Sequence, residues 1–200
     1  MGGEGWVWFT SACAFALSMS ATPGPNNAMV TASGASWGLW RTLPHMLGVS
    51  VGFPLMLLAV AFGAGEVIRS HPWMQDLLRW AGAAYLVWLA WRIATAEPSA
   101  GEGQAGGRPF SFLEAALFQW VNPKAWIIAL SAVATYTTAP GEAAVLAAIF
   151  LAVTLPVLAG WTLIGVGAAR LLRSPAALRA FNWAMAALLL LSLVPVLLGP

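Results

Sequence analysis

The chain has 200 residues, of which 60% are hydrophobic and only 8% are charged. An average soluble domain carries roughly a quarter charged residues, so this composition excludes an ordinary soluble protein. A formal net charge of +2 gives no indication of nucleic-acid binding, and the single cysteine, Cys13, excludes an internal disulfide and a cysteine-based metal site. Composition therefore predicts an all-α integral membrane protein, whose unit is a spanning helix of about 20 apolar residues.

Apolar runs predict six transmembrane helices in one domain that covers residues 1–200. In chain order the helices are predicted at 6–32, 43–65, 76–95, 110–137, 142–168 and 178–198. A polar, glycine-rich linker at 97–109 separates two halves, about 1–96 and 110–200. The runs are apolar on all faces, which excludes the alternating pattern of a membrane β-barrel. The N-terminus has no basic region, so the first run is expected to be a retained helix rather than a signal peptide.

The distribution of arginines predicts the orientation in the membrane. If the N-terminus lies outside, the inner connections hold Arg41, Arg92, Arg108, Arg170, Arg173 and Arg179, and the outer ones hold Arg69 and Arg79. The positive-inside rule favours this choice. Both termini are therefore predicted to be periplasmic, with the protein in the bacterial inner (plasma) membrane.

The first helix of each half contains a proline break. Thr22-Pro23 and Asn122-Pro123 each have the pattern of an N-cap followed by a proline at the first helical position. Because each half has three spans, the halves enter the membrane in opposite senses. The pattern predicts two inverted three-helix repeats in which helices 1 and 4 are broken.

The breaks predict the chemistry of a binding site. Proline leaves backbone carbonyls without their helical partners, and in a membrane such carbonyls are tolerated only where they are buried in protein or line a cavity. The new helix N-termini suit a carboxylate, and the freed carbonyls suit an ammonium group. A zwitterionic amino acid carries both groups.

Polar residues around the two breaks are the candidate ligands. Lys124 is the only charge deep in a predicted span, and such residues are functional candidates by default. The alternative role of Lys124 is to cap a cluster of carbonyls. The amide side chains near the breaks also have an alternative role, in helix capping and helix–helix hydrogen bonding. The predicted substrate-binding residues are Pro23, Gly24, Pro25, Asn26, Asn27, Gln119, Asn122, Pro123 and Lys124.

Three further features have structural alternatives. Glu114 is a candidate for carrying a coupling proton, but pairing with Arg108 at the membrane surface is slightly favoured. His45 titrates near neutral pH and is expected to be an interfacial hydrogen-bonding residue. Gly48-x-x-x-Gly52 and Gly34-x-x-x-Gly38 are expected to pack helices closely rather than to bind solute. Two histidines and one cysteine, with no carboxylate pair at mid-depth, predict neither an enzyme nor a metal or cofactor site.

Several motifs in this order resemble the LysE/RhtB family of amino-acid and metabolite exporters. They are TPGPNN at 22–27, GVSVG at 48–52, AGAAYLVWLAW at 81–91 and NPKAW at 122–126, and the likeness covers essentially the whole chain. The FQWV run at 118–121 is most similar to the branch near the cysteine/O-acetylserine exporters. The resemblance implies efflux driven by the proton motive force and the formation of a homodimer.

The expected function is secondary export of amino acids or close derivatives across the bacterial inner membrane, coupled to protons. The partners are then a small-molecule substrate and the lipid bilayer, without nucleic acid. The alternatives are a membrane-embedded substrate-binding subunit of an importer, an exporter of a non-amino-acid metabolite and a passive channel. Metal-ion export is disfavoured, because the breaks offer neutral amides where a divalent cation prefers carboxylates or thiolates.

Overall fold

The computed structural model describes residues 3–96, 108–139, 141–172, 174–194 and 197. The predicted linker lies outside these residues except for positions 108 and 109. The elements are α1 (Gly3–Ala21), α2 (Pro25–Ala59), the π-helical turn η1 (Val60–Ala64), α3 (Gly65–Ser70), α4 (Pro72–Ala94), α5 (Phe112–Phe118), the 3₁₀ turn η2 (Gln119–Val121), α6 (Pro123–Tyr136), α7 (Glu142–Leu171) and α8 (Pro175–Leu191). The described part of the chain contains helices and no strands, which confirms the predicted all-α class.

Both predicted helix breaks are present. The first separates α1 from α2, and the second separates η2 from α6. Asn122 is the N-cap of α6, as expected, and its side chain accepts a hydrogen bond from the backbone N–H of Lys124 at 3.2 Å. The prediction for the first break was wrong by two residues: Gly24 precedes α2 and Pro25 is its first residue. Either proline could start a helix, because its missing N–H is unpaired at that position anyway.

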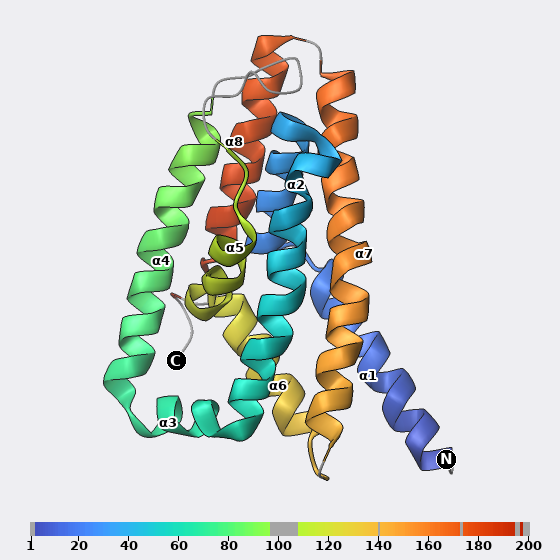
Figure 1. The fold of residues 1–200 in the computed structure, drawn as a ribbon. Helices are drawn as coiled ribbons and strands as arrows, with labels where there is room; N and C mark the ends of the chain where they lie inside the picture. The colour runs from blue at the N-terminus through green and yellow to red at the C-terminus, as the bar shows by residue number, and fades with distance from the viewer. Residues whose placement is uncertain (1–2, 97–107, 140, 173, 195–196, 198–200) are drawn as a thin grey trace.

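A second interruption lies inside α2. Gly38 has φ 77° and ψ 176°, a conformation that glycine adopts far more readily than other residues. The chain rises from the first break, turns back in this region and descends toward α3 (Figure 1). The expectation that Gly38 packs helices together was therefore wrong, because the residue forms the turn. Gly34 does pack closely, since a Cβ there would collide with the backbone carbonyl of Thr162 in α7.

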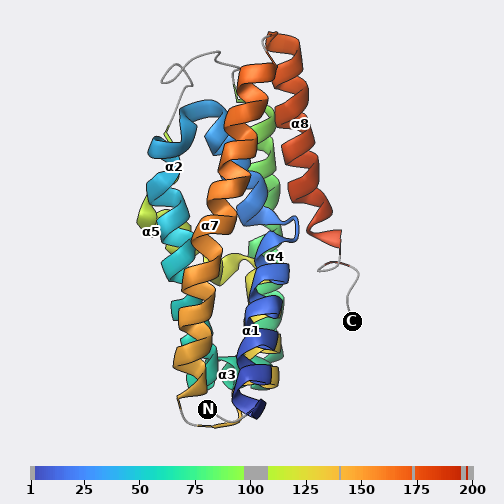
Figure 2. The same cartoon turned by 90° about the vertical axis from the view of Figure 1, so that its right-hand side faces the viewer.

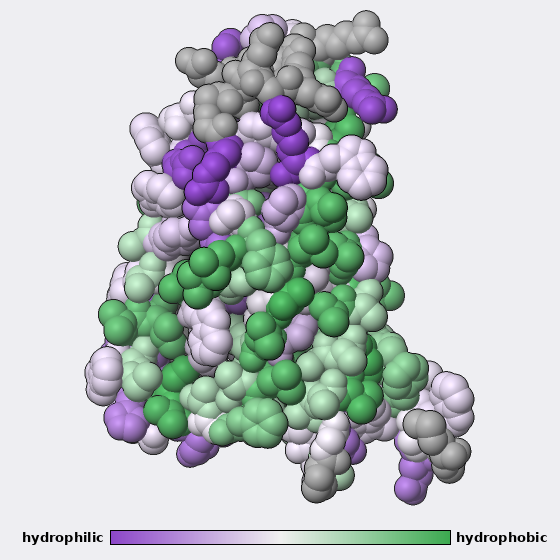
Figure 3. Space-filling model, viewed as in Figure 1, coloured by the Kyte–Doolittle hydropathy of each residue, from purple (hydrophilic) through white to green (hydrophobic). Residues whose placement is uncertain are grey.

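The surface suits a lipid environment. The helical run Pro25–Ser70, which is interrupted at Gly38, and α7 are long and apolar enough to cross a membrane. Large apolar side chains are exposed, among them Trp40 (80%), Phe62 (85%) and Leu171 (82%). Hydrophobic side chains cover most of the face in Figure 3, and hydrophilic ones gather near the end where α7 and α8 are connected. Extended apolar surface of this kind marks contact with lipid or protein.

Helix packing brings the two halves of the chain together. α2 packs most extensively against α7, α4 packs against α8, and α1 lies along α7 (Figure 2). Gly48 and Gly52 face α5, where a Cβ on Gly52 would lie 2.6 Å from the Cα of Ala116. Their predicted packing role is confirmed, and this close contact holds the approach to the second break against α2.

Candidate functional site

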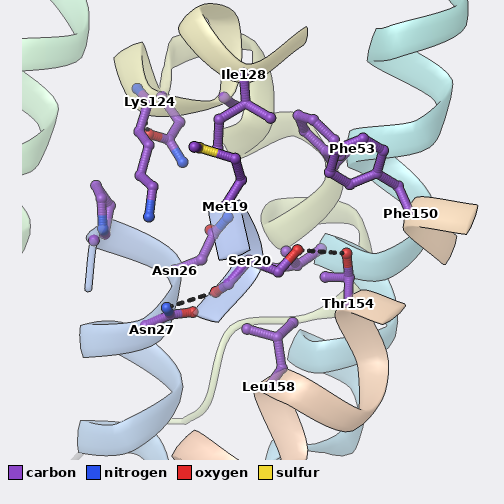
Figure 4. Close-up of a pocket in the computed structure, with 15 residues that line it drawn as sticks. Met19, Ser20, Asn26, Asn27, Phe53, Lys124, Ile128, Phe150, Thr154 and Leu158 are labelled. Atoms are coloured by element: carbon purple, nitrogen blue, oxygen red, sulfur yellow. Dashed lines mark hydrogen bonds between the residues drawn. The ribbon is translucent and has the colours of Figure 1, made fainter. Parts of the chain in front are cut away.

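A cavity of about 50 Å³ lies where the two helix breaks meet (Figure 4). We call it the break cavity. It has room for a few water molecules, since one water needs roughly 10–15 Å³ on this measure. Six of the predicted site residues line it, namely Gly24, Pro25, Asn26, Asn27, Asn122 and Lys124. The structure thus brings together residues about 100 positions apart in the sequence.

Lys124 connects the second break to the first. Its Nζ donates a hydrogen bond to the carbonyl of Thr22 at 2.5 Å and to that of Pro23 at 3.3 Å. The side chain extends from the start of α6 toward the start of α2 (Figure 4). This is the carbonyl-capping geometry, and it places the ammonium group on the wall of the cavity. A role of Lys124 toward substrate stays a prediction.

Gly24 provides the space that Lys124 occupies. A Cβ at Gly24 would lie 2.7 Å from Cδ and 3.0 Å from Nζ of Lys124. A larger residue at this position would force the lysine side chain to shift.

Amide side chains form a second connection between the breaks. Asn26 Nδ2 donates to Gln119 Oε1 at 2.9 Å, and Gln119 Nε2 donates back to Asn26 Oδ1 at 3.2 Å. Gln119 is fully buried and also donates to the carbonyl of Ala115 at 2.9 Å.

Asn27 Nδ2 donates to two carbonyls near the end of α1, those of Ser20 and Thr22, at 2.9 Å each. Gln119, Pro23 and Pro123 do not line the cavity but lie beside residues that do.

Sequence reasoning missed other residues of the wall. Thr154 of α7 lies 3.5 Å from Ser20 across the cavity, measured between the two hydroxyl oxygens. The available signal was that Thr154 is one of only two threonines in the largely apolar helix α7. The rest of the wall is apolar and is formed by Met19, Val49, Phe53, Ala125, Ile128, Phe150 and Leu158. The cavity therefore combines one cation, several amides and hydroxyls, and an apolar side.

Glu114 lies away from this cavity. Arg108 Nη1 and Nη2 donate to the two oxygens of its carboxylate at 2.6 Å each. These hydrogen bonds and the attraction of the carboxylate raise the pKa of Arg108. Glu114 also accepts from the backbone N–H of Ser111 at 2.8 Å, while the Ser111 hydroxyl caps α5 in return. The structure thus contains the Arg108 pairing, and a role of Glu114 in proton coupling stays a prediction.

The prediction that His45 is an interfacial hydrogen-bonding residue was wrong. Its side chain is 1% exposed, and neither ring nitrogen has a hydrogen-bond partner among the described residues. The reason is the turn at Gly38, which starts the descending segment earlier than predicted and places His45 nearly two turns inside it. A buried polar group without a partner costs about 1–3 kcal/mol. The described residues contain no cluster of histidine, cysteine, aspartate or glutamate that could hold a metal ion.

Comparison with known proteins identifies a transport family. The family model described as "LysE type translocator" matches residues 17–198. Proteins named "Cysteine/O-acetylserine efflux protein" from Escherichia coli strain K12, Shigella sonnei and Shigella flexneri are each 36% identical over 122 residues, which is 61% of this chain and 62% of each relative. The chain thus spans about three fifths of the length of these relatives. No solved structure matches the chain.

Proposed function

The chain belongs to the LysE type translocator family, and from this premise we propose that it exports amino acids or close derivatives across the bacterial inner membrane as a secondary transporter. The observation that carries the proposal is the break cavity, where Lys124, two helix N-termini and freed carbonyls meet. The relatives named for cysteine and O-acetylserine efflux favour a small substrate with an uncharged side chain.

The contacts of Lys124 point to an exchange of partners when substrate binds. The substrate's ammonium group takes the place of Lys124 Nζ at the carbonyls of Thr22 and Pro23. Its carboxylate then accepts hydrogen bonds from the released lysine and from the N-terminal N–H groups of α2 and α6. Each charged group keeps hydrogen-bond partners during this exchange, which matters because a buried charge without partners is strongly destabilising.

Transport requires this cavity to widen and to open to each side in turn. At about 50 Å³ it holds a few waters. Two inverted three-helix repeats, with helices 1 and 4 broken, would supply the motion by rocking of one repeat against the other. The contact of α4 with α8, the third helices of the two proposed repeats, is compatible with this arrangement.

We further propose that the proton gradient drives export. Lys124 is the only titratable side chain among the described residues that line the break cavity, and Glu114 is the other candidate for the proton carrier. The homodimer that the family resemblance implies also stays a prediction.

The deciding experiment is efflux of a panel of labelled amino acids, including cysteine and O-acetylserine, from preloaded bacterial cells with and without the protein. We expect protein-dependent loss of one or a few of these solutes, and we expect an uncoupler to slow that loss. Faster uptake in place of efflux would support the importer-subunit alternative. Efflux that is equally fast with the uncoupler would contradict proton coupling. An efflux rate that is the same with and without the protein for every amino acid would overturn the proposed substrate class.

A further inference from the structure

A second and larger cavity, of about 300 Å³, lies at the arginine-rich end of the molecule. We call it the arginine cavity. It is bounded by α2, the end of α4, α8 and the segment that leads into α5. Its polar lining consists of Ser33, Ser36, His45, Arg92, Thr95, Arg108 and Asn182. In the predicted orientation this is the cytoplasmic end, from which an exported solute must enter.

His45 supplies an unused hydrogen-bond donor to this cavity. The ring is 1% exposed, lies 5.3 Å from the ring of Phe110 and lines the cavity wall. No described residue bonds to either ring nitrogen. A neutral imidazole always carries one N–H, whichever nitrogen holds the proton. A buried donor of this kind, facing a cavity, is expected to meet an acceptor that enters from outside the protein.

The charges of the lining favour an anion. Arg92 and Arg108 both line the cavity, and Glu114, which pairs with Arg108, does not. Arg92, Arg108 and Glu114 together therefore carry a net charge of +1. The guanidinium of Arg92 lies 5.0 Å from the centre of the Trp88 ring, which orients it without neutralising its charge. A planar guanidinium matches the geometry of a carboxylate.

One helix face connects the two cavities. Asn26 lines the break cavity, and Met29, Ser33 and Ser36 line the arginine cavity. These positions recur at helical spacing on α2 and therefore lie on the same side of the helix. Asn26 and Met29 are one turn apart, about 5 Å along the axis. Asn26 also exchanges hydrogen bonds with Gln119, which lines neither cavity.

We propose that the arginine cavity is an entry site for a carboxylate-bearing solute, in which Arg92 and His45 hold the carboxylate before the solute moves along α2 to the break cavity. This inference rests on the proposed export function, to which it adds a first binding site on the cytoplasmic side. The ligand class is a small molecule with a free carboxylate.

The test is protection of a single cysteine from labelling. With Cys13→Ala as background, Ser36→Cys places a thiol in the arginine cavity, and Ser70→Cys places one on the exposed surface of α3 at the opposite end as the matched control. The full chain in lipid nanodiscs is treated with a maleimide while O-acetylserine is titrated. We expect O-acetylserine to slow labelling of Ser36→Cys and to leave labelling of Ser70→Cys unchanged. Its methyl ester, which lacks the free carboxylate, should protect neither position.

Arginine variants show whether the cavity itself binds the carboxylate. Adding Arg92→Gln should raise the O-acetylserine concentration needed for half protection by about tenfold, since a charge-assisted hydrogen bond is lost. Arg179→Gln, an exposed arginine outside the lining, should not change it. Unprotected Ser36→Cys, equal protection by the methyl ester, or protection insensitive to Arg92→Gln would each overturn the entry site.

The labelling result and the transport result can be told apart. Protection measured in nanodiscs does not depend on a gradient or on export, and it should persist in Lys124→Ala, whose altered side chain lies in the other cavity. Protection without export of any amino acid would support a carboxylate site and contradict the proposed function. Export without protection would support the proposed function and contradict the carboxylate site.

Discussion

Lys124 is the only lysine in the chain, and its ammonium group bonds carbonyls that lie 102 and 101 residues earlier in the sequence. Lys124→Ala removes both this link and the proposed partner of the substrate carboxylate. We expect it to reduce efflux at least about tenfold, the loss of one charge-assisted hydrogen bond or more. The measurement is efflux from preloaded cells, normalised to the amount of folded protein in the membrane.

A matched variant separates charge from shape at this position. Lys124→Arg keeps a cation that can reach the same carbonyls and should retain part of the activity. Normal efflux by Lys124→Ala would remove this residue from the site.

Glu114 offers a test of proton coupling at a single residue. Its carboxylate is held by Arg108 and by the N-terminus of α5, and its side chain is 44% exposed. Because glutamine can still complete the capping box, we expect Glu114→Gln to lower the free energy of unfolding by no more than about 1 kcal/mol. We also expect efflux by this variant to remain sensitive to the uncoupler. The check is efflux with and without an uncoupler. Efflux that persists but no longer responds to the uncoupler would identify Glu114 as the proton carrier.

At the scale of elements, the prolines of the breaks keep backbone groups free for binding. In Pro23→Ala and Pro123→Ala the new N–H groups allow a more continuous helix. We expect each variant to impair efflux severalfold. Pro156→Ala is the matched control, since Pro156 lies inside α7, is exposed and does not line the break cavity. If both break variants transport as well as Pro156→Ala, the broken-helix mechanism is wrong.

The contact between α4 and the second break depends on Gly82. A Cβ there would collide with the carbonyl of Val121 and lie 3.4 Å from Cγ of Pro123. We expect Gly82→Ala to destabilise the protein by about 1–3 kcal/mol, the usual cost of overpacking. Gly160→Ala is the control, because a Cβ at Gly160 meets no atom within 4 Å. Thermal unfolding in detergent should show a lower Tm for Gly82→Ala than for Gly160→Ala, and equal Tm values would contradict this account of the packing.

For the whole molecule, the orientation in the membrane is the main prediction. Arg41, Arg92, Arg108, Arg170 and Arg179 follow or precede turns at one end of the helices, while Arg69 lies at the other end, in α3. In a Cys13→Ala background, a membrane-impermeant maleimide applied to cells with a permeabilised outer membrane should label Ser70→Cys. It should label Ser174→Cys, just before α8, only after the inner membrane is opened. The opposite pattern would invert the topology and place the arginine cavity on the periplasmic side.

Local chemistry let the sequence predict much of the fold. Long apolar runs without charges predicted the helices, and the prolines with neighbouring asparagines predicted both breaks to within two residues. These features depend on the backbone preferences of adjacent residues, so they can be recognised one segment at a time. The same holds for the packing role of Gly48 and Gly52, since small residues four apart lie on one helix face.

Contacts between distant segments were decided by the tertiary structure. Spacing along the chain does not tell which carbonyls Lys124 reaches, that Asn26 and Gln119 exchange hydrogen bonds, or that Gly24 makes room for the lysine. It also did not place His45 in the interior, because that follows from the turn at Gly38. By itself, the sequence determined that there would be helices broken at two prolines, because those signals are local. The side chains that surround the breaks depend on how α1, α2, α5 and α6 pack. The interior is close-packed, so the position of each helix depends on all the others and cannot be read from one segment.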